Sequence, residues 1–166
     1  MIKRESFINE SKLGKFIQGS GHHIVNLKEE DFQYSNGYFL INCAYDLDFV
    51  ISKLFKIGAI SNYKNWTPLK TMDFKMITEC EKEIEAIQTP YLKEHRNSNQ
   101  LSSVFKIGEK FVSYRKDYID IFKNVQFKAP DDGLLPNLRV YGGDNLIGVI
   151  LPIREQHDLL TEIIGS

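Results

Sequence analysis

Residues 31–43, Asp-Phe-Gln-Tyr-Ser-Asn-Gly-Tyr-Phe-Leu-Ile-Asn-Cys, carry the clearest structural signal in the chain. Apolar and aromatic residues flank Ser35-Asn36-Gly37 on both sides, which predicts two antiparallel strands joined by a tight turn. Asparagine and glycine favour such a turn because they accept positive φ angles. A second hairpin is predicted over residues 138–153, across Gly142-Gly143-Asp144-Asn145.

The segments that precede these hairpins predict a similar order of elements twice. Residues 10–18 have the apolar spacing of a helix with Asn9 as its N-cap, and residues 23–27 form a strand. Before the second hairpin we expect a strand over 110–114, a helix over 116–125 and an extended segment over 126–129. This order fits a duplicated unit, and it also fits coincidence, because helix and strand are common elements.

The middle of the chain predicts helices. Residues 47–57 and 72–87 carry apolar side chains at helical spacing, and several glutamates form the polar face of the second helix. Pro90 marks the exit from this helix, and the polar run 93–100 is expected to be a loop.

We therefore expect an α+β fold in a single domain, residues 1–166, made of two β-α-β-β-β halves with a helical insertion between them. The boundaries are 5–45 for the first half, 46–105 for the helical middle, 106–154 for the second half and 155–166 for a C-terminal helix or tail. Each half would contribute strands to one sheet and a helix to its opposite face.

Composition excludes several classes of protein. The chain is 42% hydrophobic and 26% charged, as expected of a folded globular protein. Its net charge of -1 excludes a strongly basic surface that wraps nucleic acid, so only local patches could bind phosphates. No stretch approaches the roughly 20 apolar residues of a membrane span. The start lacks a signal-peptide pattern, so we expect a cytoplasmic location with reduced cysteines.

Three segments resemble the bacterial β sliding clamp family. Residues 114–119, Tyr-Arg-Lys-Asp-Tyr-Ile, are similar to the family's helix that opens with a Tyr-Leu-like pair. Residues 146–154, Leu-Ile-Gly-Val-Ile-Leu-Pro-Ile-Arg, are similar to its closing strand, which ends in Met-Pro-Met-Arg or a variant. Residues 27–40, which include Tyr34-Ser35-Asn36-Gly37-Tyr38-Phe39-Leu40, are similar to its strand-turn-strand but lack the usual Thr-Asp-Gly-His-Arg. The predicted helical middle has no counterpart, and a bacterial clamp chain holds three such domains.

The resemblance implies a clamp-like, non-catalytic accessory protein of DNA transactions such as replication, encoded by a phage or mobile element. It would need no cofactor, would act as a homo-oligomer or with a replication protein, and would touch the duplex DNA backbone. The two short helices would face DNA and offer Lys12, Lys15, Arg115, Lys116 and Lys123. The alternative is that these side chains form ordinary solvated helix faces, with Asp117 and Asp120 weakening any positive field.

The segment Gln156-His157-Asp158-Leu159-Leu160 is loosely similar to the glutamine-plus-leucines peptide by which partner proteins dock on clamps. Gln156, Leu159 and Leu160 are therefore candidate partner-binding residues. An amphipathic terminal helix that packs on its own domain explains the same pattern.

Other polar motifs favour structural roles. His22 and His23 are adjacent, so on an extended chain they point to opposite sides and do not ligate one metal ion. Cysteines 43 and 80 fit small core residues, and the carboxylate pairs 46/48 and 131/132 fit a helix start and a turn. We predict no metal site and no catalytic residue. Two alternatives stay open, a protein–protein regulatory module without DNA binding, and an enzyme with a site around Tyr63, Trp66 and His95.

Overall fold

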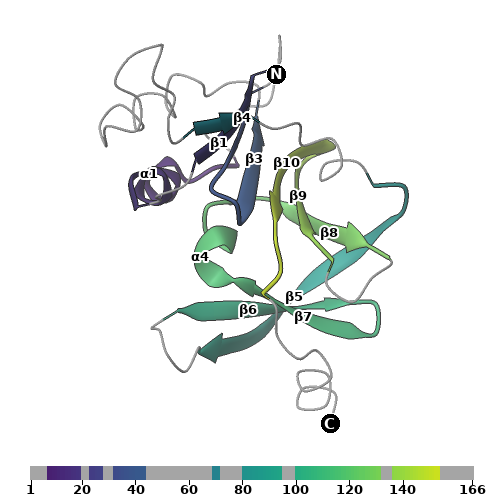
Figure 1. Ribbon diagram of the computed structural model, residues 1–166. Helices are drawn as coiled ribbons and strands as arrows, with labels where there is room; N and C mark the ends of the chain where they lie inside the picture. The colour runs from purple at the N-terminus through teal and green to yellow at the C-terminus, as the bar shows by residue number, and fades with distance from the viewer. Residues whose placement is uncertain are drawn as a thin grey trace.

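Strands dominate the fold in the computed structural model, which describes residues 7–19, 23–27, 32–43, 69–71, 80–94, 100–131 and 136–153 (Figure 1). The strands in these residues are β1 (His23–Leu27), β2 (Phe32–Ser35), β3 (Phe39–Cys43), β4 (Leu69–Thr71), β5 (Glu83–Glu94), β6 (Leu101–Ile107), β7 (Lys110–Arg115), β8 (Gln126–Pro130), β9 (Leu138–Gly142) and β10 (Asn145–Ile150). The helices are α1 (Glu10–Gly19) and the short α4 (Lys116–Ile119).

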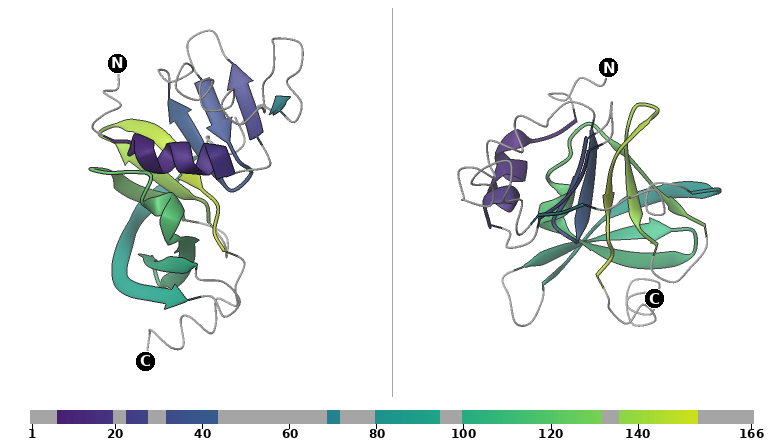
Figure 2. Two further views of the ribbon diagram at one scale, coloured as in Figure 1. Left: turned by 90° about the vertical axis from the view of Figure 1, so that its left-hand side faces the viewer. Right: turned by 45° about the horizontal axis from the view of Figure 1, so that its top comes forward.

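The strands join in the order β4-β1-β2-β3-β10-β9-β8-β5-β6-β7. All neighbours are antiparallel except β1 and β4, which are parallel. Strand β5 turns the sheet, because residues 83–85 pair with β8 and residues 86–94 pair with β6; its curved path is visible in the left panel of Figure 2. Each helix precedes three antiparallel strands, and the last strands of the two sets, β3 and β10, are neighbours.

The β2–β3 turn forms as the sequence predicts. Gly37 has a φ of 95°, which glycine adopts without a steric penalty. The Asn36 side-chain oxygen accepts the backbone amides of Tyr38 at 3.0 Å and Phe39 at 3.2 Å, and the Ser35 hydroxyl accepts the amide of Gly37 at 2.9 Å. These side-chain bonds fix the register of the hairpin, so this prediction is confirmed.

Helix α1 also begins as predicted. The side-chain oxygen of Asn9 accepts the backbone amide of Lys12 at 3.2 Å, which satisfies a helix-start donor. Leu13 and Ile17 are buried on the face that packs against the sheet. The predicted strands 23–27 and 110–114, the extended segment 126–129 and the second hairpin are confirmed as β1, β7, β8 and β9–β10.

The main hydrophobic core lies between the sheet and the two helices. It includes Leu13 and Ile17 of α1, Ile119 of α4, and Phe39 and Ile147 of the sheet. Gly148 allows the closest approach, because a Cβ there would lie 2.9 Å from the carbonyl oxygen of Leu40 and against the ring of Phe122. The chain after α4 therefore packs directly on β10.

The predicted α+β fold with a helical insertion is wrong. The described residues are mostly antiparallel β, and residues 83–94 and 101–105, expected to be helix and loop, belong to β5 and β6. Ile84 and Ala86 turn toward the core while Glu83 and Glu85 turn away, which is the two-residue period of a strand. The three-residue spacing of Ile84 and Ile87 is typical of a helix, but Ile87 is exposed and does not share a buried face with Ile84.

Pro90 does not end an element as predicted but lies inside β5. The register of β5 against β6 shifts between Gln88 and Leu92, and Pro90 lies within this bulge. A proline fits there because it has no backbone N–H to pair. The hydroxyl of Thr89 donates instead to the carbonyl of Val104 at 2.7 Å, which holds the bulge to β6.

The second predicted helix, 116–125, is too long. Helix α4 ends at Ile119 because residues 121–123, which follow it, form backbone hydrogen bonds with residues 7–9. Asn9 donates to the carbonyl of Ile121 at 2.7 Å, and Lys123 donates to the carbonyl of Phe7 at 2.9 Å. This long-range pairing has no local sequence signal. The predicted helix 47–57, residues 72–79 and the tail 155–166 lie outside the described residues.

Candidate nucleic-acid interface

Helices α1 and α4 lie on one side of the sheet (Figure 2), and aromatic side chains of α1, α4 and β3 pack together there. The Tyr118 ring lies 5.1 Å from the Phe16 ring and 5.0 Å from the Phe39 ring, centroid to centroid. The Tyr118 hydroxyl accepts hydrogen bonds from the Asn36 amide at 3.5 Å and from Arg115 Nη1 at 3.1 Å. The two segments that resemble clamp motifs, 34–40 and 114–119, are therefore in contact.

Basic side chains from both helices converge beside this cluster. Lys116 Nζ donates to Asp120 Oδ2 at 2.6 Å, and Lys12 Nζ lies 3.9 Å from the same oxygen. Lys12 belongs to α1 and Lys116 to α4, so two residues far apart in the sequence share one carboxylate. The structure thus brings together part of the basic set expected from the sequence.

Arg115 is held in place by stacking. Its guanidinium carbon lies 4.8 Å from the centroid of the Tyr118 ring and 5.7 Å from that of Phe16, distances at which a cation is attracted to a ring face. Its Nη2 lies 3.4 Å from Asp117 Oδ2. Its buried Nε has no hydrogen-bond partner in the part of the chain that is described.

Segments 10–19 and 115–124, which we call the helix face, concentrate positive charge. They hold five basic and three acidic residues, a net charge of +2, whereas the whole chain carries -1. Lys15 and Lys123 are exposed and have no ion-pair partner among the described residues. The five basic residues expected from the sequence therefore divide into three that are paired with carboxylates and two that are open to a ligand.

A second charged cluster, which the sequence did not predict, lies on the opposite face of the sheet. Arg139 Nε donates to Glu83 Oε2 at 2.9 Å, and the Tyr141 hydroxyl lies 2.7 and 2.8 Å from the two Glu83 oxygens. Lys128 Nζ lies 4.9 Å from the centroid of the Tyr141 ring. Burial, and then the hydrogen bond to Glu83, raise the pKa of Tyr141. We call these four residues the Glu83 cluster.

Large apolar side chains are exposed on β5 and at the start of β6. They are Ile87 (53%), Tyr91 (51%), Leu92 (54%) and Leu101 (39%). Ile87 opposes Lys106 and lies on the other face of the β5–β6 pair from Leu92, so we call Tyr91, Leu92 and Leu101 the β5–β6 surface. Leu92 opposes Ser103 and Leu101 opposes Glu94, so Leu92 and Leu101 lie on one face as diagonal neighbours.

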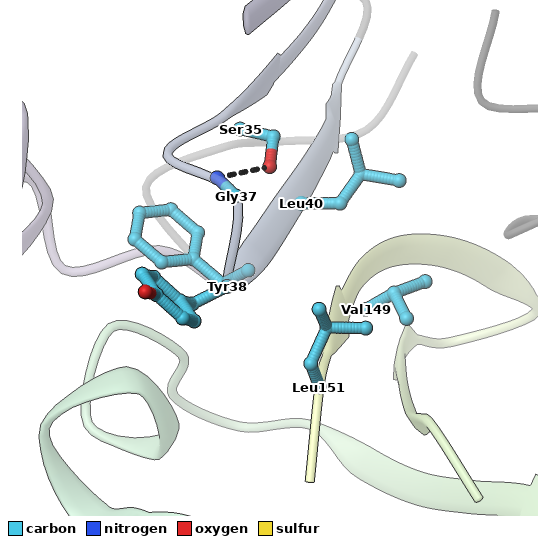
Figure 3. A pocket seen from close by; sticks show the side chains of 7 residues that line it. Ser35, Gly37, Tyr38, Leu40, Val149 and Leu151 are labelled. Carbon is cyan, nitrogen blue, oxygen red and sulfur yellow. Dashed lines mark hydrogen bonds between the residues drawn. The ribbon is translucent and has the colours of Figure 1, made fainter. Parts of the chain in front are cut away.

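A small pocket lies beside the exposed Tyr38, where β3 and β10 meet (Figure 3). Leu40, Val149 and Leu151 line its apolar wall, and its volume is about 30 Å³. A space of this size holds one or two water molecules.

No candidate metal site is present in the described residues. They contain no group of three or more His, Cys, Asp or Glu side chains that could hold a metal ion. Cys80 is half-buried, with Sγ 3.3 Å from the carbonyl oxygen of Lys82. Asp131 pairs with Lys82 at 2.8 Å, and that hydrogen bond lowers the pKa of the carboxyl.

The structure leaves other sequence candidates unplaced. His23 lies in β1 and Cys43 lies in β3. At these two positions the structure describes the backbone but not the side chain. The remaining candidates lie outside the described residues, namely His22, Asp46, Asp48, Tyr63, Trp66, His95, Asp132, Gln156, Leu159 and Leu160.

The chain matches no protein-family model, and neither the curated proteins nor the solved structures contain a significant match. Among the described residues no helix has the length and apolar character needed to cross a membrane. The described part of the chain is therefore mostly antiparallel β, with α1 and α4 packed on one face of the sheet.

Proposed function

We propose that this protein is a clamp-like, non-catalytic accessory of DNA transactions that contacts the duplex backbone through the helix face. One observation carries the proposal, the convergence of Lys12 from α1 and Lys116 from α4 beside the stacked Arg115. Lys15 and Lys123 add two exposed cations to the same segments.

The arrangement of the strands supports the clamp resemblance. Each helix is followed by three antiparallel strands, and the two sets join through β3 and β10, so α1 and α4 lie on the same side of the sheet. The same resemblance motivates the proposed phage or mobile-element origin and the proposed partners, further copies of the chain and a replication protein.

Contacts of this kind are sequence-independent. Lysine and arginine side chains bind phosphate oxygens and release condensed counterions, so affinity falls steeply as salt is added. The pairs that Lys12 and Lys116 form with Asp120 are partly solvent-exposed and contribute roughly 0–1 kcal/mol, so a phosphate can replace the carboxylate at little cost.

The test is the affinity of the protein for a short duplex DNA at several salt concentrations. We expect the double variant Lys15→Glu/Lys123→Glu to bind at least about tenfold more weakly than wild type at low salt, with a shallower salt dependence. Lys106→Glu, which reverses one exposed charge on β6 outside the helix face, is the control for the single variants Lys15→Glu and Lys123→Glu. Equal affinities for wild type and the double variant would contradict the proposal.

The β5–β6 surface favours a second candidate, a protein–protein regulatory module that does not bind DNA. Its occupant would be a partner protein with a complementary apolar surface, since exposed Tyr and Leu side chains are typical anchors of protein interfaces. Under this candidate the protein ignores duplex DNA even at low salt. A fluorescent apolar dye would bind to wild type and more weakly to Tyr91→Ser/Leu92→Ser.

A further inference from the structure

The acidic residues of the helix face are placed differently from one another. Asp117 pairs with Arg115 two positions earlier, and its side chain is 54% exposed. Asp120 instead lies between the helices, 2.6 Å from Lys116 Nζ and 3.9 Å from Lys12 Nζ. Asp120 therefore contacts lysines from both helices, whereas Asp117 pairs within its own segment.

A carboxylate in that position resembles a bound phosphate. Both groups present anionic oxygens that accept hydrogen bonds from ammonium donors. Asp120 is also the C-cap of α4, and its backbone amide bonds to the carbonyl of Lys116 at 2.9 Å, which fixes the start of its side chain. The backbone therefore places Asp120 at the end of α4, and its carboxylate lies beside both lysines.

We propose that Asp120 limits the affinity of the helix face for duplex DNA by occupying the position between Lys12 and Lys116 where a backbone phosphate binds. This inference rests on the proposed function and adds the residue that sets the affinity of the helix face for duplex DNA. Binding then requires exchange of the Asp120 carboxylate for a phosphate, and the displaced carboxylate stays nearby as a like charge. Removing that charge makes both lysines fully available.

The experiment compares duplex DNA binding by wild type, Asp120→Asn, Asp120→Glu and Asp131→Asn across a range of salt concentrations. Asp120→Asn keeps the side-chain shape and removes the charge, while Asp120→Glu keeps the charge. Asp131→Asn changes the net charge equally but removes a carboxylate that pairs with Lys82, away from the helix face. Thermal unfolding of each variant shows that it is folded.

We expect Asp120→Asn to bind about fivefold more tightly than wild type at low salt, because a like charge a few ångströms from a phosphate repels it. The slope of log affinity against log salt should steepen by about 1, because in wild type the displaced Asp120 carboxylate takes up a cation and so offsets one of the counterions released from DNA. Asp131→Asn should bind like wild type, and Asp120→Glu, which keeps the negative charge, should not bind more tightly than wild type.

Two results would overturn the inference, and they differ in what they say of the proposed function. If wild type binds DNA with salt dependence and Asp120→Asn gains no more than Asp131→Asn, Asp120 does not limit affinity, and the DNA proposal stands. If neither wild type nor Asp120→Asn binds at the lowest salt, the DNA proposal fails and the inference fails with it. Binding by Asp120→Asn alone would support both.

Discussion

The helix face and the opposite face of the sheet each carry a cation–carboxylate cluster, and the two clusters differ in burial. The Lys12 and Asp120 side chains are 48% and 30% exposed, whereas those of Arg139 and Glu83 are 5% and 20% exposed. Ion pairs near water contribute little to stability, but a buried pair leaves an uncompensated charge when one partner is removed. The ion pair of the Glu83 cluster therefore stabilises the fold, whereas the pairs of the helix face are weak enough for a ligand to replace them.

The cross-strand pairing explains why Arg139 is buried. Arg139 opposes Val149 on β10, and Val149 in turn opposes Leu40 on β3. The Arg139 side chain therefore leaves the sheet next to a row of apolar residues. Glu83 reaches it from β5 and supplies the compensating charge. The β5 segment that was expected to be helical thus provides the carboxylate that this face of the sheet needs.

The largest effect is expected from Glu83→Ala. This change removes the Glu83 carboxylate that pairs with the buried Arg139, and we predict a loss of about 3–5 kcal/mol in the free energy of unfolding. Urea denaturation measures it. Asp131→Ala, which breaks an exposed pair with Lys82, is the control and should change stability far less. A loss below about 1 kcal/mol for Glu83→Ala would remove the distinction between the two clusters.

Alkaline pH gives the next effect. Burial raises the pKa of Tyr34 and of Tyr114 above the ordinary value, and the Tyr114 hydroxyl donates to the carbonyl of Pro136 at 2.7 Å. The folded state then holds protons that the unfolded state loses above about pH 10. Stability is fully present below that pH and falls above it, by up to about 1.4 kcal/mol per pH unit for each such tyrosine.

Denaturation curves recorded from pH 7 to pH 11 check this slope. Tyr114→Phe should be less stable at pH 7, because its hydrogen bond is lost, and should show a shallower decline at high pH. A wild-type stability that stays constant up to pH 11 would show that these hydroxyls ionise freely in the folded protein.

The smallest effect is expected on the helix face. Lys116→Ala removes the 2.6 Å bond to Asp120 and should change the free energy of unfolding by less than about 1 kcal/mol. The same variant should weaken duplex DNA binding measurably at low salt. A large loss of stability would mean that this pair is structural, and the helix face would then resemble the Glu83 cluster.

Local features of the fold were predictable from sequence. The Asn36-Gly37 turn and the Asn9 cap depend on neighbouring residues alone, and both form as expected. The end of α4 was not predictable, because its cause is pairing between residues 7–9 and 121–123. Strand β5 was misread although Glu83-Ile84-Glu85-Ala86 alternates in polarity, a signal that indicates a strand.

The candidate site was predictable only in part. The sequence indicates basic residues on two short helices, and the four-residue spacing of Lys116 and Asp120 indicates a pair. The approach of Lys12 to Asp120 depends on tertiary packing of α1 against α4, which no local pattern shows. The Glu83–Arg139 pair joins distant strands and has no sequence signal at all.

The most direct test of the central claim is a map of backbone amide chemical shifts during titration with duplex DNA at low salt. The account predicts shifts at Lys12, Lys15, Lys116 and Lys123 that reverse when salt is added, with β5 and β6 unchanged. Absence of shifts at the helix face, or shifts confined to the β5–β6 surface, would contradict it.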